Sequence, residues 1–422
     1  MDFQKVERCR SCGSGTLADI LSLGEQYMVN FVDDPNEMVS KGPLDLVLCD
    51  PARGGCGLLQ LKHTFNRDLL YRKYWYKSGI SSMMRDALAD VAKKAEHIVE
   101  LKEGDIVIDI GSNDGTLLKN YNQDAAKVGF EPSNLWELGA ADHNTTVIHD
   151  YFNYSAFDKR FPGKKAKVIT AIAMFYDLDD PNGFVEDIKK CLDENGVWII
   201  QMNYLGLMLD NNTFDNISHE HLEYYSFLSL SKLLDRHDIE AFDVELNDVN
   251  GGSFRIYVRH KGSEIMEFEG AAKRIEELKR AELRAGLDKI DTYLRFAEKI
   301  NGIRKNLLSM LEGEVGKGKK IFIYGASTRG LVVLQFCGIS NKLIAAATDM
   351  NKDKWGKYIV GTGIPIVPID EYRESHPDYL FILPYHFLKE LIQQERQYLI
   401  DGGKFIVAIP KVRIIDKSEI QK

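Results

Sequence analysis

No apolar run in the 422-residue chain approaches the roughly 20 residues that a membrane-spanning helix requires. The first residues, Met1 to Glu7, also lack the apolar core of a secretory signal peptide. From these two absences we expect a cytoplasmic protein that has no membrane partner.

The chain has no excess of positive charge either. Its 54 Lys and Arg residues face 63 Asp and Glu residues, which gives a net charge of -9. Because nucleic-acid binding favours a basic surface, we expect no nucleic-acid partner. A hydrophobic share of 44% is enough for packed cores, and the length suggests two to four domains at roughly 100–200 residues each. We expect a monomer or a weak homo-oligomer.

Cysteine is scarce, with six residues in the whole chain. In a cytosolic protein of this length, cysteines are more often metal ligands or core residues than disulfide partners. Cys191 and Cys337 lie in apolar, helix-like contexts and are expected in the core.

The other four cysteines form two pairs near the N-terminus, Cys9 with Cys12 and Cys49 with Cys56. Two thiolate pairs on turns can close a tetrahedral site, and four protein ligands leave no open position on the metal. The pattern therefore predicts structural Zn2+. A redox Cys-x-x-Cys is the alternative, but it would open a helix in a βαβ unit, a context that is missing here.

The pattern of apolar residues divides the chain into four segments. Residues 1–75 carry the cysteine pairs, residues 76–262 alternate strand-like and helix-like runs, residues 263–314 have helical spacing, and residues 315–422 alternate again. We expect an α/β protein with a Rossmann-like sheet in the middle. A small N-terminal zinc-binding domain precedes it, and a helical connector leads to a second Rossmann-like domain at the C-terminus.

The middle segment opens with a strand, a glycine turn and a helix, which is where an open α/β sheet binds its ligand. The strand runs over residues 105–110, and the loop over residues 111–115 contains two glycines but no full G-x-G-x-x-G. Acids in and beside this loop suit a cationic cofactor without phosphates. A second strand ends at Glu131, where an acid can accept hydrogen bonds from ribose hydroxyls or be an ordinary strand-end residue. S-adenosylmethionine is the expected cofactor, held by Asp109, Gly111, Ser112, Asn113, Asp114, Gly115, Glu131 and Pro132.

Further along, Ser218-His219-Glu220-His221 is followed by Tyr224 and Tyr225. The two histidines are two residues apart, so they would not share a helical face as zinc ligands do in His-Glu-x-x-His. General acid–base chemistry is the better interpretation, since histidine titrates near neutral pH. A polar loop without chemistry is the alternative.

The C-terminal segment repeats the strand, glycine turn and helix at residues 320–330, and a second strand there ends at Asp349. This pattern alone is compatible with a dinucleotide site. A purely structural role is also open, because a fold does not define a function.

Taken together, these features resemble the C-methyltransferases that act on nucleotide-linked keto-deoxysugars, and the resemblance covers nearly the whole chain. Its marks are the paired cysteines with Cys56 to Leu61, and the motifs at residues 74–79, 109–115, 129–132, 219–226 and 250–255. The resemblance implies a class I methyltransferase sheet between a zinc-binding domain and a C-terminal domain that helps hold the nucleotide sugar. The implied chemistry is C-methylation alpha to a ketone, at C3 of a 4-keto sugar, through an enolate.

By the same resemblance, His221 is the candidate base, supported by Glu220 and His219, and Tyr76 donates a hydrogen bond near the sugar. Two positions depart from the family pattern: Ser218 replaces a tyrosine, and Asp177 stands where a histidine is expected. Asp177 is therefore a second candidate for the base, or a residue that binds a hydroxyl. The residues expected to bind the substrate are Ser218, Tyr225, Arg255, Ser327, Thr328, Arg329 and His386.

Three other interpretations remain open at this point, one of them a non-catalytic binding protein that has kept the cofactor fold. An O- or N-methyltransferase acting on a sugar or small metabolite would need no carbon acid. A nicotinamide-dependent oxidoreductase could use either glycine loop, although Asp114 and the incomplete glycine pattern of the first loop disfavour it.

Overall fold

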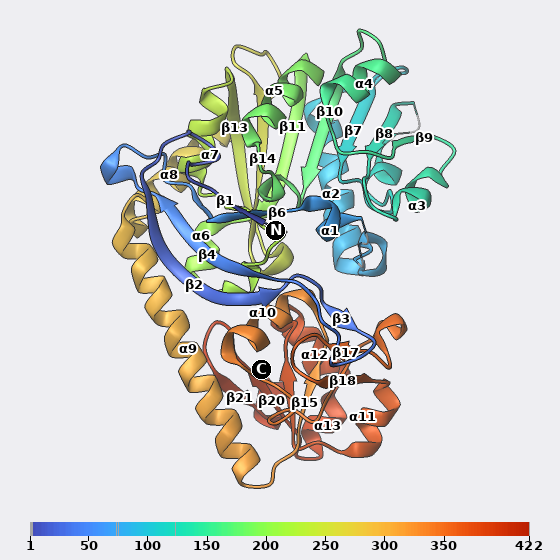
Figure 1. Ribbon diagram of the computed structural model, residues 1–422. Helices are drawn as coiled ribbons and strands as arrows, with labels where there is room; N and C mark the ends of the chain where they lie inside the picture. The colour runs from blue at the N-terminus through green and yellow to red at the C-terminus, as the bar shows by residue number, and fades with distance from the viewer. Residues whose placement is uncertain (1–2, 73, 75, 123, 422) are drawn as a thin grey trace.

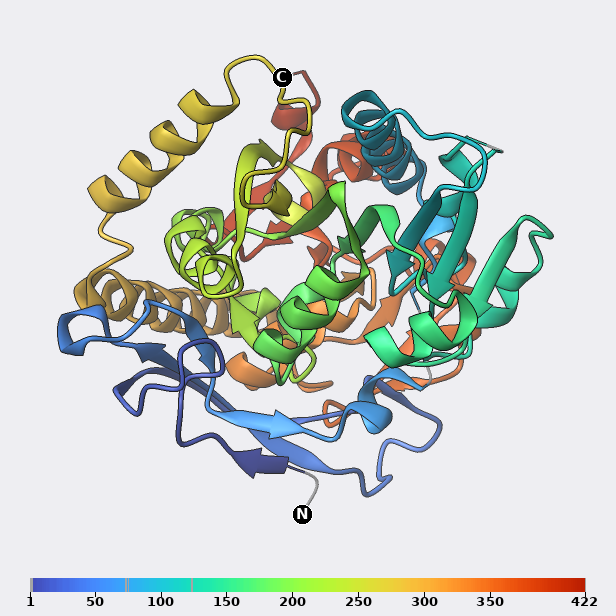
Figure 2. The ribbon, with the colours of Figure 1, turned by 90° about the horizontal axis from the view of Figure 1, so that it is seen from above.

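The computed structural model describes residues 3–72, 74, 76–122 and 124–421. Trp75, in the middle of the motif at residues 74–79, lies outside them. Two lobes stack on each other, with N-terminal strands between them (Figure 1). Viewed from above, these strands lie along one side of the molecule, beside both lobes (Figure 2).

A seven-stranded sheet forms the first lobe. Its five strands β7 to β11 are parallel to one another, whereas β14 is antiparallel to both β11 and β13. The reversed strand next to the sheet edge distinguishes this order from a fully parallel dinucleotide-binding sheet. In spatial order the strands are β13 (Ile239–Asn247), β14 (Ser253–His260), β11 (Leu192–Asn203), β10 (Ala166–Ile172), β7 (Ile106–Ile110), β8 (Ala126–Phe130) and β9 (Thr145–Ile148).

Alternating side chains of these strands fill two separate cores, one on each face of the sheet. On β7, Ile106, Ile108 and Ile110 join one core, and Val107 joins the other. Such near-continuous apolar strands are typical of a sheet that is covered on both faces. The helices of this lobe are α2 (Ser82–Ile98), α3 (Trp136–Ala140), α4 (Tyr154–Arg160), α5 (Pro181–Cys191), α6 (Leu205–Asp210), α7 (Phe227–Asp235) and α8 (Ala271–Ala285).

The N-terminal segment forms no isolated domain but joins both lobes. Its strand β5 pairs with β12 of the first lobe, and its strand β3 pairs with β17 of the second. A two-stranded sheet and a long hairpin complete it. Its elements are β1 (Phe3–Lys5), β2 (Leu17–Tyr27), β3 (Phe31–Val32), β4 (Lys41–Cys49), β5 (Leu59–Leu61), β6 (His63–Phe65) and α1 (Arg67–Tyr71), with β12 at Glu223–Tyr224.

The second lobe contains a central parallel sheet of five strands, extended by antiparallel strands at its edges. The strands are β15 (Ile321–Tyr324), β16 (Ala346–Thr348), β17 (Tyr358–Ile359), β18 (Ile364–Val367), β19 (Tyr379–Ile382), β20 (Lys404–Val407) and β21 (Arg413–Ile415). Its helices are α10 (Thr328–Cys337), α11 (Ile369–Ser375), α12 (Leu388–Gln394) and α13 (Arg396–Ile400). The predicted α/β fold class, with two Rossmann-like sheets, is thus confirmed.

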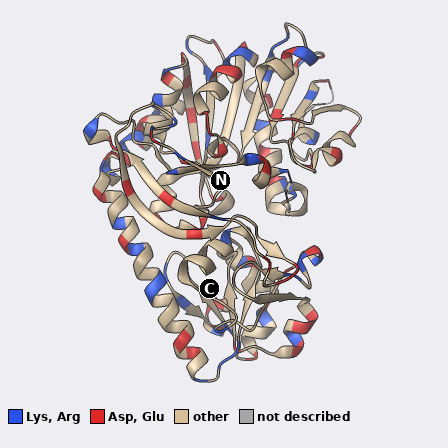
Figure 3. Cartoon of the chain, in the orientation of Figure 1, with Lys and Arg blue, Asp and Glu red and all other residues tan. Residues whose placement is uncertain are grey.

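The predicted helical connector consists of two helices with different neighbours. Helix α8 packs on β13 and α7 of the first lobe, whereas α9 (Ile290–Gly316) packs on β2 and α10. Acidic and basic side chains are mixed along α9, which runs down one side of the molecule (Figure 3). Among the helices of the described residues, none is long and apolar enough to cross a membrane.

Candidate active site

A cavity of about 650 Å³ opens at the carboxyl ends of β7, β8 and β10. This volume is within the usual range for pockets that bind small molecules, roughly 300–1,000 Å³. The N-terminal segment supplies one wall of the cavity and the sheet supplies another. Lining residues include Thr64, Arg67, Tyr71, Tyr74, Tyr76, Met84, Asp109, Gly111, Asn113, Glu131, Phe152, Met174, Asp177, Asp179, Leu222 and Asn250.

The loop after β7 turns sharply at the floor of this cavity. Gly111 and Asn113 both have positive φ angles, 71° and 53°, in the region where glycine and asparagine are least strained. Glu131, at the end of β8, accepts hydrogen bonds from the amides of Asn113 (2.7 Å) and Ser133 (2.8 Å). The acid at the end of the second strand is therefore fixed against the loop and faces the same cavity.

Asp109 is buried on β7, and the Thr170 hydroxyl donates to it at 2.7 Å. Burial raises the pKa of this carboxyl to about 7, and the charge of Glu131 adds to the rise. A nearby cation would favour the ionised form of both acids. The cavity, its two acids and its bent loop fit S-adenosylmethionine, which is cationic and carries ribose hydroxyls.

Not every residue predicted at the cofactor lines the cavity. Asp114 points to the segment ahead of α2, where its Oδ2 accepts the Gly79 amide at 2.8 Å. The Asn113 side chain holds the same segment through the Tyr76 carbonyl (3.0 Å) and the Ser78 amide (3.0 Å). Asp114 thus anchors a cavity wall, and its contact with the cofactor stays a prediction, as does that of Gly115.

The four N-terminal cysteines meet at one point. All their sulfur atoms lie within 4.8 Å of one another, and the Cys9–Cys56 and Cys12–Cys49 distances are 3.5 Å. Tetrahedral zinc, with Zn–S bonds of about 2.3 Å, separates its sulfur ligands by roughly 3.8 Å. Cys9, Cys12, Cys49 and Cys56 therefore fit Zn2+, and the long spacing between the last two is taken up by a turn at Pro51–Arg53.

The cavity wall opposite Glu131 carries an unusual group of acids and tyrosines. Asp177, at the end of the short 3-10 helix η4 (Phe175–Asp177), lines the cavity, and no described residue donates a hydrogen bond to its buried Oδ1. Burial raises its pKa well above the ordinary value, and the charge of Glu220 raises it further. Burial also raises the pKa of Glu220 to about 7. A carboxyl near neutrality is suited to general acid–base work.

Tyr71 also belongs to this group of acids and tyrosines, because its hydroxyl donates to the Glu220 carbonyl at 2.8 Å. Tyr74 and Tyr76 line the same wall, so the aromatic motif at residues 74–79 does reach the cavity. Tyr71 was not singled out in the sequence. Its position just before that motif was the available signal.

The two histidines of the His-Glu-His motif do not line this cavity. The Nε2 atom of His219 bonds the Gly42 carbonyl at 3.0 Å, and its ring packs on Phe65. The Nδ1 atom of His221 bonds the Asn216 carbonyl at 2.6 Å, and its ring packs on Tyr176. Burial lowers the pKa of both rings to about 4. The structure therefore gives both histidines other partners, and their catalytic roles stay predictions.

Ser218 and Tyr225 likewise do not line the cavity, and the buried Ser218 hydroxyl has no hydrogen-bond partner among the described residues. The Tyr225 hydroxyl donates to Glu223 at 2.8 Å in the core, and the Ser218 carbonyl accepts the His221 amide at 3.1 Å. Neither side chain belongs to the cavity lining described above.

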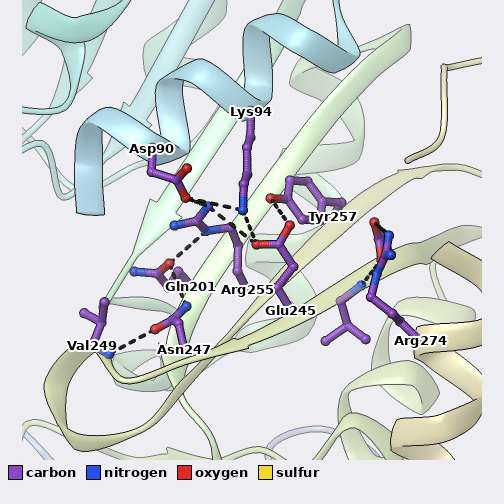
Figure 4. Close-up of polar contacts among 11 residues, drawn as sticks. Asp90, Lys94, Gln201, Glu245, Asn247, Val249, Arg255, Tyr257 and Arg274 are labelled. Atoms are coloured by element: carbon purple, nitrogen blue, oxygen red, sulfur yellow. Dashed lines mark hydrogen bonds and ion pairs between the residues drawn. The ribbon is translucent and has the colours of Figure 1, made fainter. Parts of the chain in front are cut away.

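Arg255 lies in a network of polar side chains between α2 and the sheet (Figure 4). Its guanidinium donates to Asp90 (2.7 Å) and Gln201 (2.8 Å), and only 3% of its side chain is exposed. The network also includes Lys94, Glu245, Asn247 and Tyr257. Arg255 therefore holds α2 on the sheet, an arrangement that leaves it no direct contact with the cavity.

The predicted phosphate-binding residues of the second lobe also have partners within the chain. Arg329 forms an ion pair with buried Asp215 at 2.7 Å and donates to the Asn250 carbonyl and the Tyr385 hydroxyl. The Ser327 hydroxyl caps α10 through the Gly330 amide. Arg329 thus joins the two lobes. Asp215, its partner, carried no signal in the sequence.

Two further residues of this lobe were expected at the substrate. The Thr328 hydroxyl accepts a bond from Asn30 at 3.4 Å. His386 packs between Tyr385 and Phe387, and burial lowers its pKa to about 3. Their contacts with a nucleotide sugar stay predictions.

Comparisons with known proteins agree with this arrangement. Three family models match in succession: a zinc binding domain (residues 9–71), a methyltransferase domain (76–243) and a C-methyltransferase C-terminal domain (248–410). The C-methyltransferase NovU of Streptomyces niveus is 28% identical over 415 residues, which are 97% of each chain.

Two solved methyltransferase structures each align with less than half of this chain. An S-adenosylmethionine-dependent methyltransferase from Clostridium acetobutylicum aligns with 44% of this chain and 94% of its own, at 12% identity and a TM-score of 0.33. A complex of the plantazolicin methyltransferase BpumL with SAH aligns with 43% and 87%, also at 12% identity and 0.33.

The strand order and the matched methyltransferase domain define an S-adenosylmethionine-dependent methyltransferase of class I. This excludes the oxidoreductase alternative. The chain thus matches a zinc binding domain, a methyltransferase domain and a C-methyltransferase C-terminal domain in succession, and it is similar over nearly its whole length to a C-methyltransferase.

Proposed function

We propose that the enzyme methylates the carbon alpha to the ketone, C3, of a nucleotide-linked 4-keto-deoxysugar. The observation that carries this proposal is Asp177, which lines the same cavity as Glu131 and has a buried carboxyl oxygen that accepts no hydrogen bond from a described residue. A carbon can be methylated only after it has lost a proton, and a base with a raised pKa is needed near that carbon. O- and N-methylation have no such need.

In the proposed mechanism, Asp177 takes the proton from C3. The C–H electron pair then forms the enolate, whose negative charge spreads to the ketone oxygen. Tyr76, on the same wall, is the proposed hydrogen-bond donor to the sugar, and Glu220 tunes the ionisation of Asp177. When bound, S-adenosylmethionine supplies an electrophilic methyl group on a positively charged sulfur.

Asp177 is favoured over His221 as the base for two reasons. His221 does not line the cavity and its Nδ1 is already bonded to a carbonyl, whereas Asp177 has a free oxygen in the described wall. The low pKa of His221, about 4, also makes it a weak proton acceptor at neutral pH.

Proton exchange tests this proposal without the methyl transfer. The enzyme is incubated in deuterated water with S-adenosylhomocysteine and thymidine- or guanosine-diphosphate 4-keto-deoxysugars, and loss of the alpha proton is followed by NMR. We expect exchange with at least one sugar, which is lost in Asp177→Asn and kept in His221→Asn. Methyl transfer to oxygen or nitrogen without exchange would refute C-methylation of a keto sugar.

A further inference from the structure

Arg10 lies between two of the zinc ligands, within the turn Cys9–Cys12, which we call the zinc knuckle. Its side chain is only 2% exposed although it carries a charge. The guanidinium donates to the Leu61 carbonyl at 2.6 Å and the His63 carbonyl at 3.2 Å. A buried arginine that donates hydrogen bonds to backbone carbonyls is held in one position.

The same guanidinium contacts two residues that line the cavity. It donates to the Thr64 hydroxyl at 2.8 Å and pairs with the Asp179 carboxylate at 3.4 Å, and the Thr64 hydroxyl donates to the same Asp179 oxygen at 2.6 Å. Thr64 and Asp179 both line the cavity. Asp179 is two residues after Asp177, so these contacts hold the segment that carries the proposed base.

The other end of this segment is also attached to the zinc knuckle. Asn182, in the first turn of α5, donates through its Nδ2 to the carbonyls of Arg10 and Ser11, each at 2.9 Å. Residues 177–182 are therefore fixed to the knuckle at two points, once through the Arg10 side chain and once through its backbone.

We infer that the zinc knuckle positions Asp177, with Arg10 and Asn182 as positioning residues for the reaction. The metal closes the turn, the turn sets the direction of the Arg10 side chain, and that side chain fixes Asp179 beside the base. The function of the zinc site thus extends from stabilising the N-terminal domain to shaping the cavity of the first lobe. This inference rests on the proposed function, since it needs Asp177 as the base.

Arg10→Gln and Asn182→Ala test the inference, with Arg236→Gln as the matched control. Arg236 contacts the same knuckle, donating to the Ser11 carbonyl (2.6 Å) and hydroxyl (2.7 Å), but it contacts neither Asp179 nor Asn182 in the described structure. Each holoenzyme is assayed for zinc content, for the thiolate absorption of its Co2+-substituted form, and for binding of S-adenosylhomocysteine.

We expect all three variants to keep one metal per chain and an unchanged Co2+ spectrum. Arg10→Gln and Asn182→Ala should lower kcat about ten- to hundred-fold, as is typical of residues that orient a site, with little change in the affinity for S-adenosylhomocysteine. Arg10→Lys should restore part of this loss, and Arg236→Gln should match the wild type.

Amide hydrogen exchange of the peptide covering residues 174–184 provides a readout that needs no substrate. We expect faster exchange there in Arg10→Gln and Asn182→Ala, and unchanged exchange at residues 105–120. Wild-type exchange and kcat in a metal-replete Arg10→Gln would overturn the inference, as would metal loss in all three variants. If the wild type exchanges no sugar proton, the proposed function fails, while the peptide measurements still decide whether the knuckle orders this segment.

Discussion

Asp177→Asn is the most informative single substitution in this enzyme. The amide has nearly the shape of the carboxyl, so the packing around η4 is kept, but it cannot accept the proton of a carbon acid. General-base catalysis contributes typically ~10²–10⁴-fold, which corresponds to about 3–5 kcal/mol of transition-state stabilisation. We expect kcat for methylation and the rate of proton exchange to fall by this factor.

The structure also predicts the effect of this substitution on stability. Burial raises the pKa of Asp177 in the folded protein, so folding favours the protonated form. The cost of burying the charge is absent at low pH and grows as the pH rises above the carboxyl pKa of the unfolded chain. An uncharged asparagine avoids this cost, so the Tm of Asp177→Asn at pH 8 should equal or exceed that of the wild type.

The pH dependence of kcat/KM provides a third test of Asp177→Asn. In the wild type, kcat/KM should rise with pH as the proposed base loses its proton, at a pH well above the ordinary carboxyl range, because burial and then the charge of Glu220 raise the pKa of Asp177. Asp177→Asn should lose this rise. Exchange within about two-fold of the wild type, with the rise in kcat/KM retained, would show that another residue is the base.

Three other substitutions probe the rest of the site. Glu131→Gln places an amide group against two backbone amides. It should weaken binding of S-adenosylhomocysteine by about 1–3 kcal/mol in a calorimetric titration. Unchanged affinity would mean that the cofactor lies elsewhere. Cys12→Ser should lower the zinc content and the Tm, whereas a full metal complement with a wild-type Tm would exclude Cys12 as a ligand. Arg329→Gln leaves buried Asp215 without its partner and should lower the free energy of unfolding by about 3–5 kcal/mol. Asp215→Asn added to it should recover part of that loss. If the losses of the two single variants simply add in the double variant, the ion pair is contradicted.

The cofactor end of the site was predictable because its residues are close together in the sequence. The strand at 106–110, its glycine turn and Glu131 at the next strand end follow from local pattern alone. The helix expected after the turn is only the short 3-10 helix η3 (Leu118–Asn120). The metal ligands were equally accessible, since cysteine pairs have few other uses in such a chain.

Contacts between distant segments could not be predicted in the same way. Arg255 and Arg329 were both expected to bind the substrate, yet each meets a carboxylate from another element, Asp90 and Asp215. A single sequence does not show which acid will neutralise a buried arginine, because that depends on how helices and lobes pack. The same limit applies to Asp114, whose partner is the Gly79 amide.

Three arginines hold the elements around the substrate end of the cavity in place. Arg10, Arg255 and Arg329 each join two elements, and each chain of contacts ends at the cavity: at Asp179, at α2 with Met84, and at the carbonyl of Asn250. A wall held by such contacts keeps its shape when a substrate enters, which favours a fixed position for Asp177, the proposed base. The zinc-binding segment and the second lobe therefore both contact residues that line the same cavity, Arg10 at Asp179 and Arg329 at Asn250.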